Sequence, residues 1–153
     1  MTLTDISQIV GSVLQDIDTQ MVASVVEDEM LFGLENFGVP HDQIEERIAQ
    51  TLETVGISNL REREIATLSG GQKQKVAIAA ILAMHPRVLV LDEPTAALDP
   101  ASSTLVFDTL RKVREESVTV VVIEQKVALL SEYCDRILVM SKGSLVLDGT
   151  PRE

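Results

Sequence analysis

The sequence has one cysteine and no long apolar run. The lone Cys134 excludes a disulfide within the chain and fits a reducing compartment. The longest uninterrupted apolar run, Val76–Met84, has about half the length of a membrane-spanning helix. Met1 is not followed by the basic and then apolar residues of a secretion signal. We therefore expect a cytoplasmic protein that reaches a membrane only through partner proteins.

Basic residues are also scarce. Thirteen lysines and arginines stand against 24 aspartates and glutamates, which gives a formal net charge of -11. A general nucleic-acid binder needs a basic face, so this balance argues against nucleic acid as a partner. The apolar fraction of 45% is typical of a folded globular chain, and 153 residues suffice for one domain with a core.

A phosphate-binding loop is missing as well. None of the eight glycines begins a G-x-x-x-x-G-K-[ST] sequence, and none is followed by lysine. That loop is the device that cradles the phosphates of a nucleotide. Its absence excludes a self-contained nucleotide site of this kind within the 153 residues.

Hydrophobic patterning predicts helices up to about residue 84. Apolar residues at 44, 48, 52 and 55 form one stripe of a helix, which Gly56 ends. Ser24 and Glu27 have the spacing of a capping box at the start of an earlier helix. Residues 16–20 are polar and are predicted to form a loop. The helices predicted in this region span about 24–36, 41–56 and 72–84.

The pattern after residue 84 predicts an open parallel α/β sheet. Residues 87–92 and 117–123 are continuous apolar runs, so we expect buried parallel strands there. The helix at 101–116 is predicted to turn Leu105, Leu110 and Val113 inward. The other predicted elements are a strand at 9–14, a helix at 127–133, and strands at 136–140 and 144–147.

Two adjacent acids, Asp92 and Glu93, close the apolar run at 87–92. Open α/β sheets bind ligands at the carboxyl ends of their strands, and neighbouring side chains on a strand point in opposite directions. One acid can therefore hold Mg²⁺ through water, while the other orients and deprotonates an attacking water. A solvated turn after a strand explains such a pair about equally well.

The run Ser69, Gly70, Gly71 and Gln72 opens a predicted helix. Free N–H groups and the helix dipole favour an anion there, and glycines let the backbone approach a phosphate closely. Ser69 is also an ordinary N-cap residue, which is the simpler explanation of a lone Ser-Gly-Gly.

Asp99 and Pro100 have the pattern of a cap and the first position of the next helix. Taken together, residues 68–100 resemble the signature motif, Walker B motif and D-loop of the ABC (ATP-binding cassette) ATPases. The resemblance implies an α/β, P-loop NTPase-like fold whose first strand or strands and phosphate loop are missing. It implies a single truncated domain over residues 1–153, with a helical subdomain at about 20–84 and an α/β core at about 85–153.

The resemblance also implies roles for individual residues. Gln15 matches the Q-loop glutamine, Asp92 the Mg²⁺-associated aspartate and Glu93 the catalytic glutamate. ATP and Mg²⁺ are the implied cofactors, with Asp92 and Gln15 holding Mg²⁺ through water. In this family the signature, here Ser69 to Gln72, and the D-loop, here Asp99, serve the nucleotide site shared with a second ATPase subunit.

Two stretches, Glu27–Asn36 and Leu68–Ala79, resemble the energy-coupling-factor importers, which take up vitamins, cobalt or nickel. That resemblance implies a transmembrane transporter subunit as a partner and a place on the inner face of the cell membrane. The acidic residues after Ser24 would then face the membrane subunit, although a solvated face is the simpler explanation of those acids.

The sequence departs from the family in two places. The phosphate loop, its strand and the aromatic residue that stacks on adenine are absent, and Gln125 stands where the family has a switch histidine. Glutamine can donate a hydrogen bond to a γ-phosphate, but it cannot become cationic as imidazole can. We therefore expect slow hydrolysis at the site that contains Glu93 and Gln125, within an asymmetric pair of subunits.

Three interpretations follow for the whole chain. It is a piece of an importer's ATPase subunit, or a natural non-catalytic remnant that pairs with a complete subunit and donates the signature face. A DNA-repair or chromosome ATPase is the third, which the acidic balance and the lack of sustained heptads disfavour. Because an interior strand is missing, we expect the isolated chain to self-associate or to be only marginally stable, and to show no measurable ATP binding.

Overall fold

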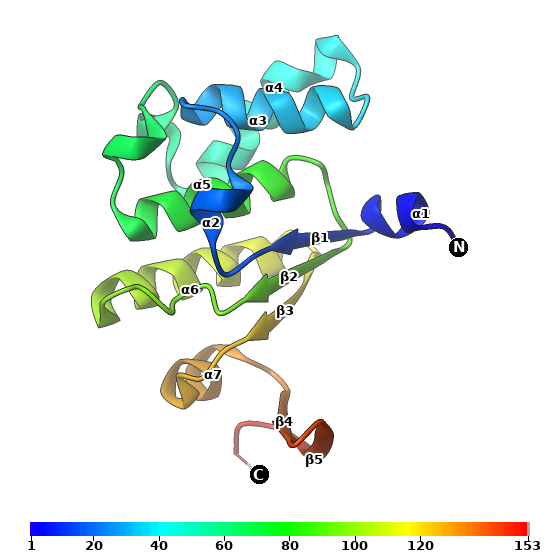
Figure 1. The fold of residues 1–153 in the computed structure, drawn as a ribbon, viewed down its shortest axis with the longest axis vertical. Coiled ribbons are helices and arrows are strands. Elements are labelled where there is room, and N and C mark those ends of the chain that lie inside the picture. Colours follow the sequence, from blue (N-terminus) through cyan, green and yellow to red (C-terminus); the bar gives the residue numbers. More distant parts are fainter. Residues whose placement is uncertain (153) are drawn as a thin grey trace. The chain divides into compact units, whose positions relative to one another are not determined.

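The computed structural model describes residues 1–152. Two compact units divide the chain after Ile123. The first unit contains a parallel sheet of β1 (Val10–Val13), β2 (Val88–Asp92) and β3 (Thr119–Ile123), in that order (Figure 1). The three strands run in register, so their carboxyl ends meet at one edge. The prediction of a parallel α/β sheet is confirmed.

Helices lie against this sheet and extend beyond it as a helical layer (Figure 1). α5 (Gly70–Leu82) packs against β1, and α6 (Pro100–Glu115) packs against β3 and α5. α3 (Val26–Asn36) and α4 (His41–Val55) pack on each other and on α5. The shorter elements are α1 (Leu3–Ser7), α2 (Ile17–Gln20) and two 3₁₀ turns, η1 (Ser58–Leu60) and η2 (Ile65–Thr67). Within residues 1–152, no helix has the length and apolarity to cross a bilayer.

The core of the first unit begins with the apolar stripe of α4. Its four members are 5% exposed or less, as the spacing predicted: Ile44, Ile48, Leu52 and Val55. Gly56 ends the helix with φ 76°, a left-handed conformation that glycine adopts without strain. Met30 of α3 and Ile78 of α5 are fully buried in the same core.

β1 and α5 approach each other closely at Gly11. A side chain at this position would collide with Cγ2 of Ile81. Ile81 is β-branched and its first side-chain torsion is stiff in a helix, so this crossing requires glycine. The contact fixes α5 relative to β1, and therefore the start of α5 relative to the sheet edge.

The second unit contains α7 (Val127–Tyr133) and an antiparallel pair, β4 (Ile137–Ser141) and β5 (Ser144–Gly149). Arg136 Nη2 lies 2.6 Å from Asp148 Oδ2, and this contact raises the pKa of Arg136 and lowers that of Asp148. Both predicted strands are confirmed, but β4 pairs with β5 rather than adding a strand to the parallel sheet.

The predicted capping box of α3 is wrong. The N-cap is Val25, with no side-chain hydrogen bond, and the carbonyl of Ser24 accepts a hydrogen bond from the N–H of Ile65. Val25 also forms a β-bridge with Glu64. Pairing with the segment before the signature therefore holds this backbone extended, and Ser24 is not in position to cap the helix.

Two further local predictions are wrong. Residues 16–20 contain the helix α2, which Asp16 caps by accepting the N–H of Thr19. Leu105 is 56% exposed, because α6 turns the neighbouring face, with Val106, toward the core. A helix of four residues gives too short a pattern to be seen in the sequence, and adjacent apolar residues leave the inward face of α6 ambiguous.

The strand at the carboxyl end of the first unit is less buried than predicted. Val121 and Ile123 of β3 are 45% and 53% exposed. The exposed residues alternate with Val120 and Val122, which pack against the core, so they lie on the opposite face of this edge strand. A continuous apolar run indicates that a strand is suited to burial, but it does not indicate which element covers the strand.

Candidate functional site

The two adjacent acids lie at the carboxyl edge of the sheet. Asp92 is the last residue of β2 and is exposed, whereas Glu93 is partly buried. Gln15 reaches the same edge just after β1, and its Nε2 donates a hydrogen bond to Glu93 Oε2 at 3.2 Å. The structure therefore brings together three of the predicted site residues from distant parts of the sequence.

Glu93 has an unusual backbone conformation. Its φ of 45° lies in the left-handed region, which residues with a side chain rarely adopt. The Glu93 N–H donates to the carbonyl of Ile123 at 2.8 Å, which continues the pairing of β2 with β3. Such strain persists where the surrounding structure imposes it, and it concentrates at functional sites. β3 thus contributes to holding the Glu93 carboxylate near Gln15.

The signature run begins α5 with a complete capping box. The N–H of Gln72 donates to Ser69 Oγ at 3.2 Å, and the N–H of Ser69 donates to Gln72 Oε1 at 3.0 Å. The predicted N-cap is confirmed. Because the box uses only side-chain oxygens as acceptors, the hydroxyl hydrogen of Ser69 and the amide hydrogens of Gln72 are not consumed by it.

The two signature glycines also have a packing role that the sequence did not indicate. A Cβ on Gly70 would lie 3.0 Å from Leu98 Cδ2, and one on Gly71 would lie 3.3 Å from Ser102 Cβ. Both distances are tighter than ordinary contacts. The glycines therefore let the first turn of α5 pack closely on residues 98–102, whatever their role toward a phosphate.

Asp99 caps α6 within that packed segment. It accepts the N–H of Ser102 at 2.9 Å and the hydroxyl of Ser102 at 2.7 Å, and Pro100 occupies the first helical position. These hydrogen bonds lower the pKa of Asp99. Both predicted structural roles are confirmed, and the signature and the D-loop residue lie side by side.

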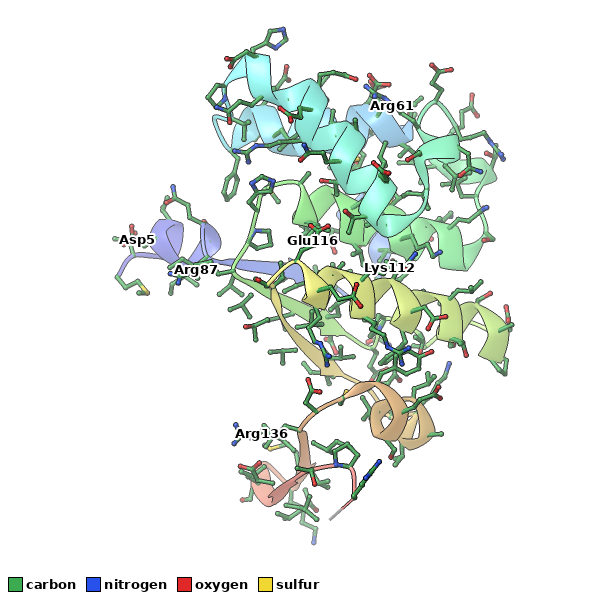
Figure 2. All side chains as sticks on the ribbon, turned by 180° about the vertical axis from the view of Figure 1, so that it is seen from behind. Asp5, Arg61, Arg87, Lys112, Glu116 and Arg136 are labelled. Carbon is green, nitrogen blue, oxygen red and sulfur yellow. The ribbon has the colours of Figure 1, made fainter. Side chains whose placement is uncertain are left out.

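A pocket of about 300 Å³ opens beside the start of α5. Its lining residues are Gly56, Ile57, Asn59, Leu60, Ser69, Gly71, Gln72, Lys75, Ser102 and Leu105. Burial lowers the pKa of the Lys75 ammonium, and the charge of Lys112 on α6 adds to this (Figure 2). These described lining residues include one cation and no carboxylate, so the pocket is better suited to an anionic group than to a cation.

Arg61 joins three segments of the helical layer (Figure 2). Its Nε lies 2.9 Å from Glu27 Oε2 on α3, and its Nη2 lies 2.7 Å from Glu45 Oε2 on α4. Hydrogen bonds to Glu45 and then to Glu27 raise the pKa of Arg61. The segment that leads into the signature is thereby tied to both helices.

The acids at the start of α3 are not simply a solvated face. Glu29 is 8% exposed, and its Oε2 accepts the N–H of Val22 at 2.9 Å and of Ala23 at 2.7 Å. The interpretation as a solvated face is wrong for Glu29, whose carboxylate holds the loop between α2 and α3. Asp28 remains exposed.

A second contact that the sequence did not reveal links α2 to α5. Lys73 Nζ lies 2.9 Å from Asp18 Oδ1. The two residues are 55 positions apart, and no local spacing pattern signals such a pair. Each is a neighbour of predicted site residues, since Asp18 follows Gln15 closely and Lys73 follows the signature directly.

Gln125 belongs to the second unit, where its side chain is exposed. Its backbone N–H donates to Glu124 Oε1 at 2.9 Å. Glu93 belongs to the first unit, so the predicted role of Gln125 beside Glu93 stays a prediction.

The donor set at the sheet edge fits Mg²⁺ held together with a nucleotide. No group of three or more His, Cys, Asp or Glu side chains within residues 1–152 could hold a metal. Mg²⁺ usually keeps several waters and takes one or two carboxylates together with substrate phosphates. The exposed carboxylate of Asp92 beside Glu93 and the amide of Gln15 match that incomplete, water-rich coordination.

Sequence comparison places the chain in a transporter family. A family model described as "ABC transporter" matches residues 2–96. An energy-coupling factor transporter ATP-binding protein, EcfA, of Methanothermobacter thermautotrophicus is 42% identical over 151 residues, which are 99% of this chain and 49% of that protein. EcfA1 of Listeria monocytogenes is 45% identical over 150 residues, which are 97% of this chain and 53% of that protein. The chain thus spans about half the length of the curated relatives it matches.

A solved structure has the same fold. It is cbiO1 from Clostridium perfringens, described as part of the ABC transporter complex cbiONQ, with a TM-score of 0.91 at 35% identity. The match covers 97% of this chain and 60% of that one. The expected fold class is confirmed, with a parallel sheet and helical layer as in ABC ATPases. On this evidence the chain belongs to the ABC transporter family.

Proposed function

We propose that this chain forms the part of an importer's ATPase subunit that carries the catalytic acid and the signature. The observation that carries the proposal is the hydrogen bond from Gln15 to Glu93 beside Asp92, at the carboxyl edge of the parallel sheet. The names of the relatives support an importer of the energy-coupling-factor type, with ATP as the nucleotide.

Glu93 is proposed as the general base that orients and deprotonates the attacking water. Gln15 Nε2 holds one oxygen of this carboxylate, which limits the directions in which the other can accept a proton. Asp92 and Gln15 are proposed to hold Mg²⁺ through water. When bound, Mg²⁺ neutralises charge on the phosphates.

The start of α5 is proposed to serve a nucleotide held by a second ATPase subunit. The hydroxyl of Ser69, the amide of Gln72 and the N–H groups of the first turn are hydrogen-bond donors at the positive end of a helix dipole. Leu98 and Ser102, on either side of Asp99 in the sequence, pack against this turn, and Asp99 would face the same shared site. Gln125 is proposed to donate a hydrogen bond to the terminal phosphate in place of a histidine.

A transmembrane transporter subunit is the proposed second partner, which would hold the protein on the inner face of the membrane. Both Glu27 and Glu29 make contacts within the chain. The exposed Asp28 and Glu35 are therefore the acids of α3 best placed to meet basic residues of that subunit.

The catalytic role can be tested in a chimera that supplies the missing phosphate loop. The half of the Listeria monocytogenes relative that this chain does not match is joined to residues 1–153 in the relative's order, and ATP turnover is measured. We expect turnover that falls by at least about 100-fold in Glu93→Gln, because a positioned general base contributes 10² or more. Gln125→His should raise turnover.

The outcomes separate the two remaining interpretations. A chimera that is no faster than its Glu93→Gln variant contradicts the catalytic role and favours a chain that only donates its signature to a complete partner. Unchanged turnover in Gln125→His refutes the impairment assigned to Gln125.

A further inference from the structure

An ion pair connects the segment that carries Gln15 to the helix that begins at the signature. Lys73 Nζ and Asp18 Oδ1 are 2.9 Å apart, and their side chains are 22% and 70% exposed. Asp18 lies in α2, three residues after Gln15, and Lys73 follows Gln72 directly. A single contact therefore spans two clusters of the candidate site that the sequence separates by more than 50 residues.

The other hydrogen bonds of this segment are local. Gln20 Oε1 accepts the N–H of Leu14 at 2.8 Å, and Gln20 Nε2 donates to the carbonyl of Ser12 at 3.2 Å, which closes the segment on β1. These bonds close the turn on β1, and neither of them reaches α5 directly. Partly buried Ile17 of α2 and the following Met21 pack on the core, and α2 contacts α5, but apolar contacts are non-directional.

We propose that Lys73 and Asp18 are a positioning pair. The pair keeps Gln15 against Glu93 and couples the position of Gln15 to that of the start of α5. The inference rests on the proposed function only in taking Glu93 as the general base. Exposed ion pairs are weak and are screened by salt. The pair therefore biases the position of Gln15 without locking it, so a movement of α5 would be transmitted to the hydrogen bond at Glu93.

The test uses the nucleotide-free chimera labelled with ¹⁵N, so that it does not depend on ATP hydrolysis. The reporters are the side-chain amide resonance of Gln15 and hydrogen exchange at the backbone amides of Leu14, Thr19 and Met21. We expect Lys73→Ala and Asp18→Ala to shift the Gln15 resonance in the same way and to speed exchange about two- to fivefold, as for loss of an exposed ion pair.

Matched variants distinguish a positioning role of the ion pair from a general loss of structure. Lys73→Arg, and the exchange of charges in Asp18→Lys with Lys73→Asp, should return the Gln15 resonance toward that of the wild type. Lys112→Ala removes an exposed lysine of α6 and should leave it unchanged. High salt added to the wild-type protein should reproduce the single substitutions, because it screens the pair.

Two results would overturn the proposal. One is a Gln15 resonance that is unaffected by both single substitutions, and the other is a shift that neither Lys73→Arg nor the charge exchange reverses. If a substitution also speeds exchange at Ile48 in the core, the fold is damaged, and the salt titration of the wild-type protein decides. Loss of ATP turnover in the chimera leaves these readouts intact, so the two proposals fail separately.

Discussion

Glu29 holds a loop from inside the helical layer. Its carboxylate accepts two backbone N–H groups, those of Val22 and Ala23, from a side chain that is 8% exposed. Hydrogen bonds to a charged acceptor are stronger than those between neutral groups. This residue therefore determines the path of the chain between α2 and α3.

Truncation of Glu29 should destabilise the protein more than any change at its exposed neighbour. We expect Glu29→Ala to lower the free energy of unfolding by about 2–3 kcal/mol, because two N–H groups lose their acceptor. Glu29→Gln keeps an acceptor oxygen and should cost about half as much. Urea unfolding measures the difference, with Asp28→Ala as the control, for which a change within about 0.5 kcal/mol is expected. Equal losses at positions 28 and 29 would contradict this role.

At the scale of residues, the sequence predicted contacts between residues that are close together along the chain and missed contacts between distant ones. The caps at Ser69 and Asp99 were predicted because a cap and its N–H partners lie within three residues. Glu29 was not recognised, because a buried acid and a solvated acid look alike in a run of acids. The Arg61 contacts to Glu27 and Glu45 join residues 34 and 16 positions apart, which no local pattern can show.

At the scale of elements, α6 depends on its first turn. Asp99 accepts both the N–H and the hydroxyl of Ser102 at the start of this 16-residue helix. The first of these bonds and then the second lower the pKa of Asp99. The cap therefore acts in the ionised form and is pH-dependent.

The loss of this cap should matter at neutral pH and fade in acid. The pKa of Asp99 is lower in the folded state than in the unfolded state, where it is about 3.9. The stabilisation by this cap is therefore complete above the pKa of the unfolded state and is lost as the pH falls through the pKa of the folded state. We expect Asp99→Ala to lower the melting temperature by roughly 2–4 °C at pH 7 and progressively less below about pH 4. Calorimetry across pH measures this, and Asp99→Asn should keep a cap without the pH dependence. A constant difference between wild type and Asp99→Ala would refute it.

Predictions of elements succeeded where the pattern was long. The stripe of α4 and the run of β2 were identified because each repeats its signal over several residues. α2 has four residues and was missed, and the inward face of α6 was misplaced by one position at Leu105. The short turn at Lys142 and Gly143 indicates an antiparallel pair, and β4 pairs with β5 across it.

At the scale of the whole molecule, the described chain exposes apolar strands in both units. β3 is an edge strand of the parallel sheet and exposes Val121 and Ile123 on the face turned away from the core. In the second unit, Leu138 of β4 and Val146 of β5 are more than half exposed. Exposed apolar edge strands are templates for pairing with another chain. This exposure supports the expectation that the isolated chain self-associates.

A charge on the edge strand should weaken that association without changing the core. Val121→Lys removes an apolar side chain that a second copy would bury and places a charge where strands would pair. We expect self-association to weaken by about tenfold, as loss of one buried valine predicts. Sedimentation velocity over a wide range of concentrations measures this, with Val127→Lys on the exposed side of α7 as a control of equal charge. A wild-type chain that stays monomeric at high concentration, or equal effects of the two substitutions, would show that β3 is not the surface through which copies associate.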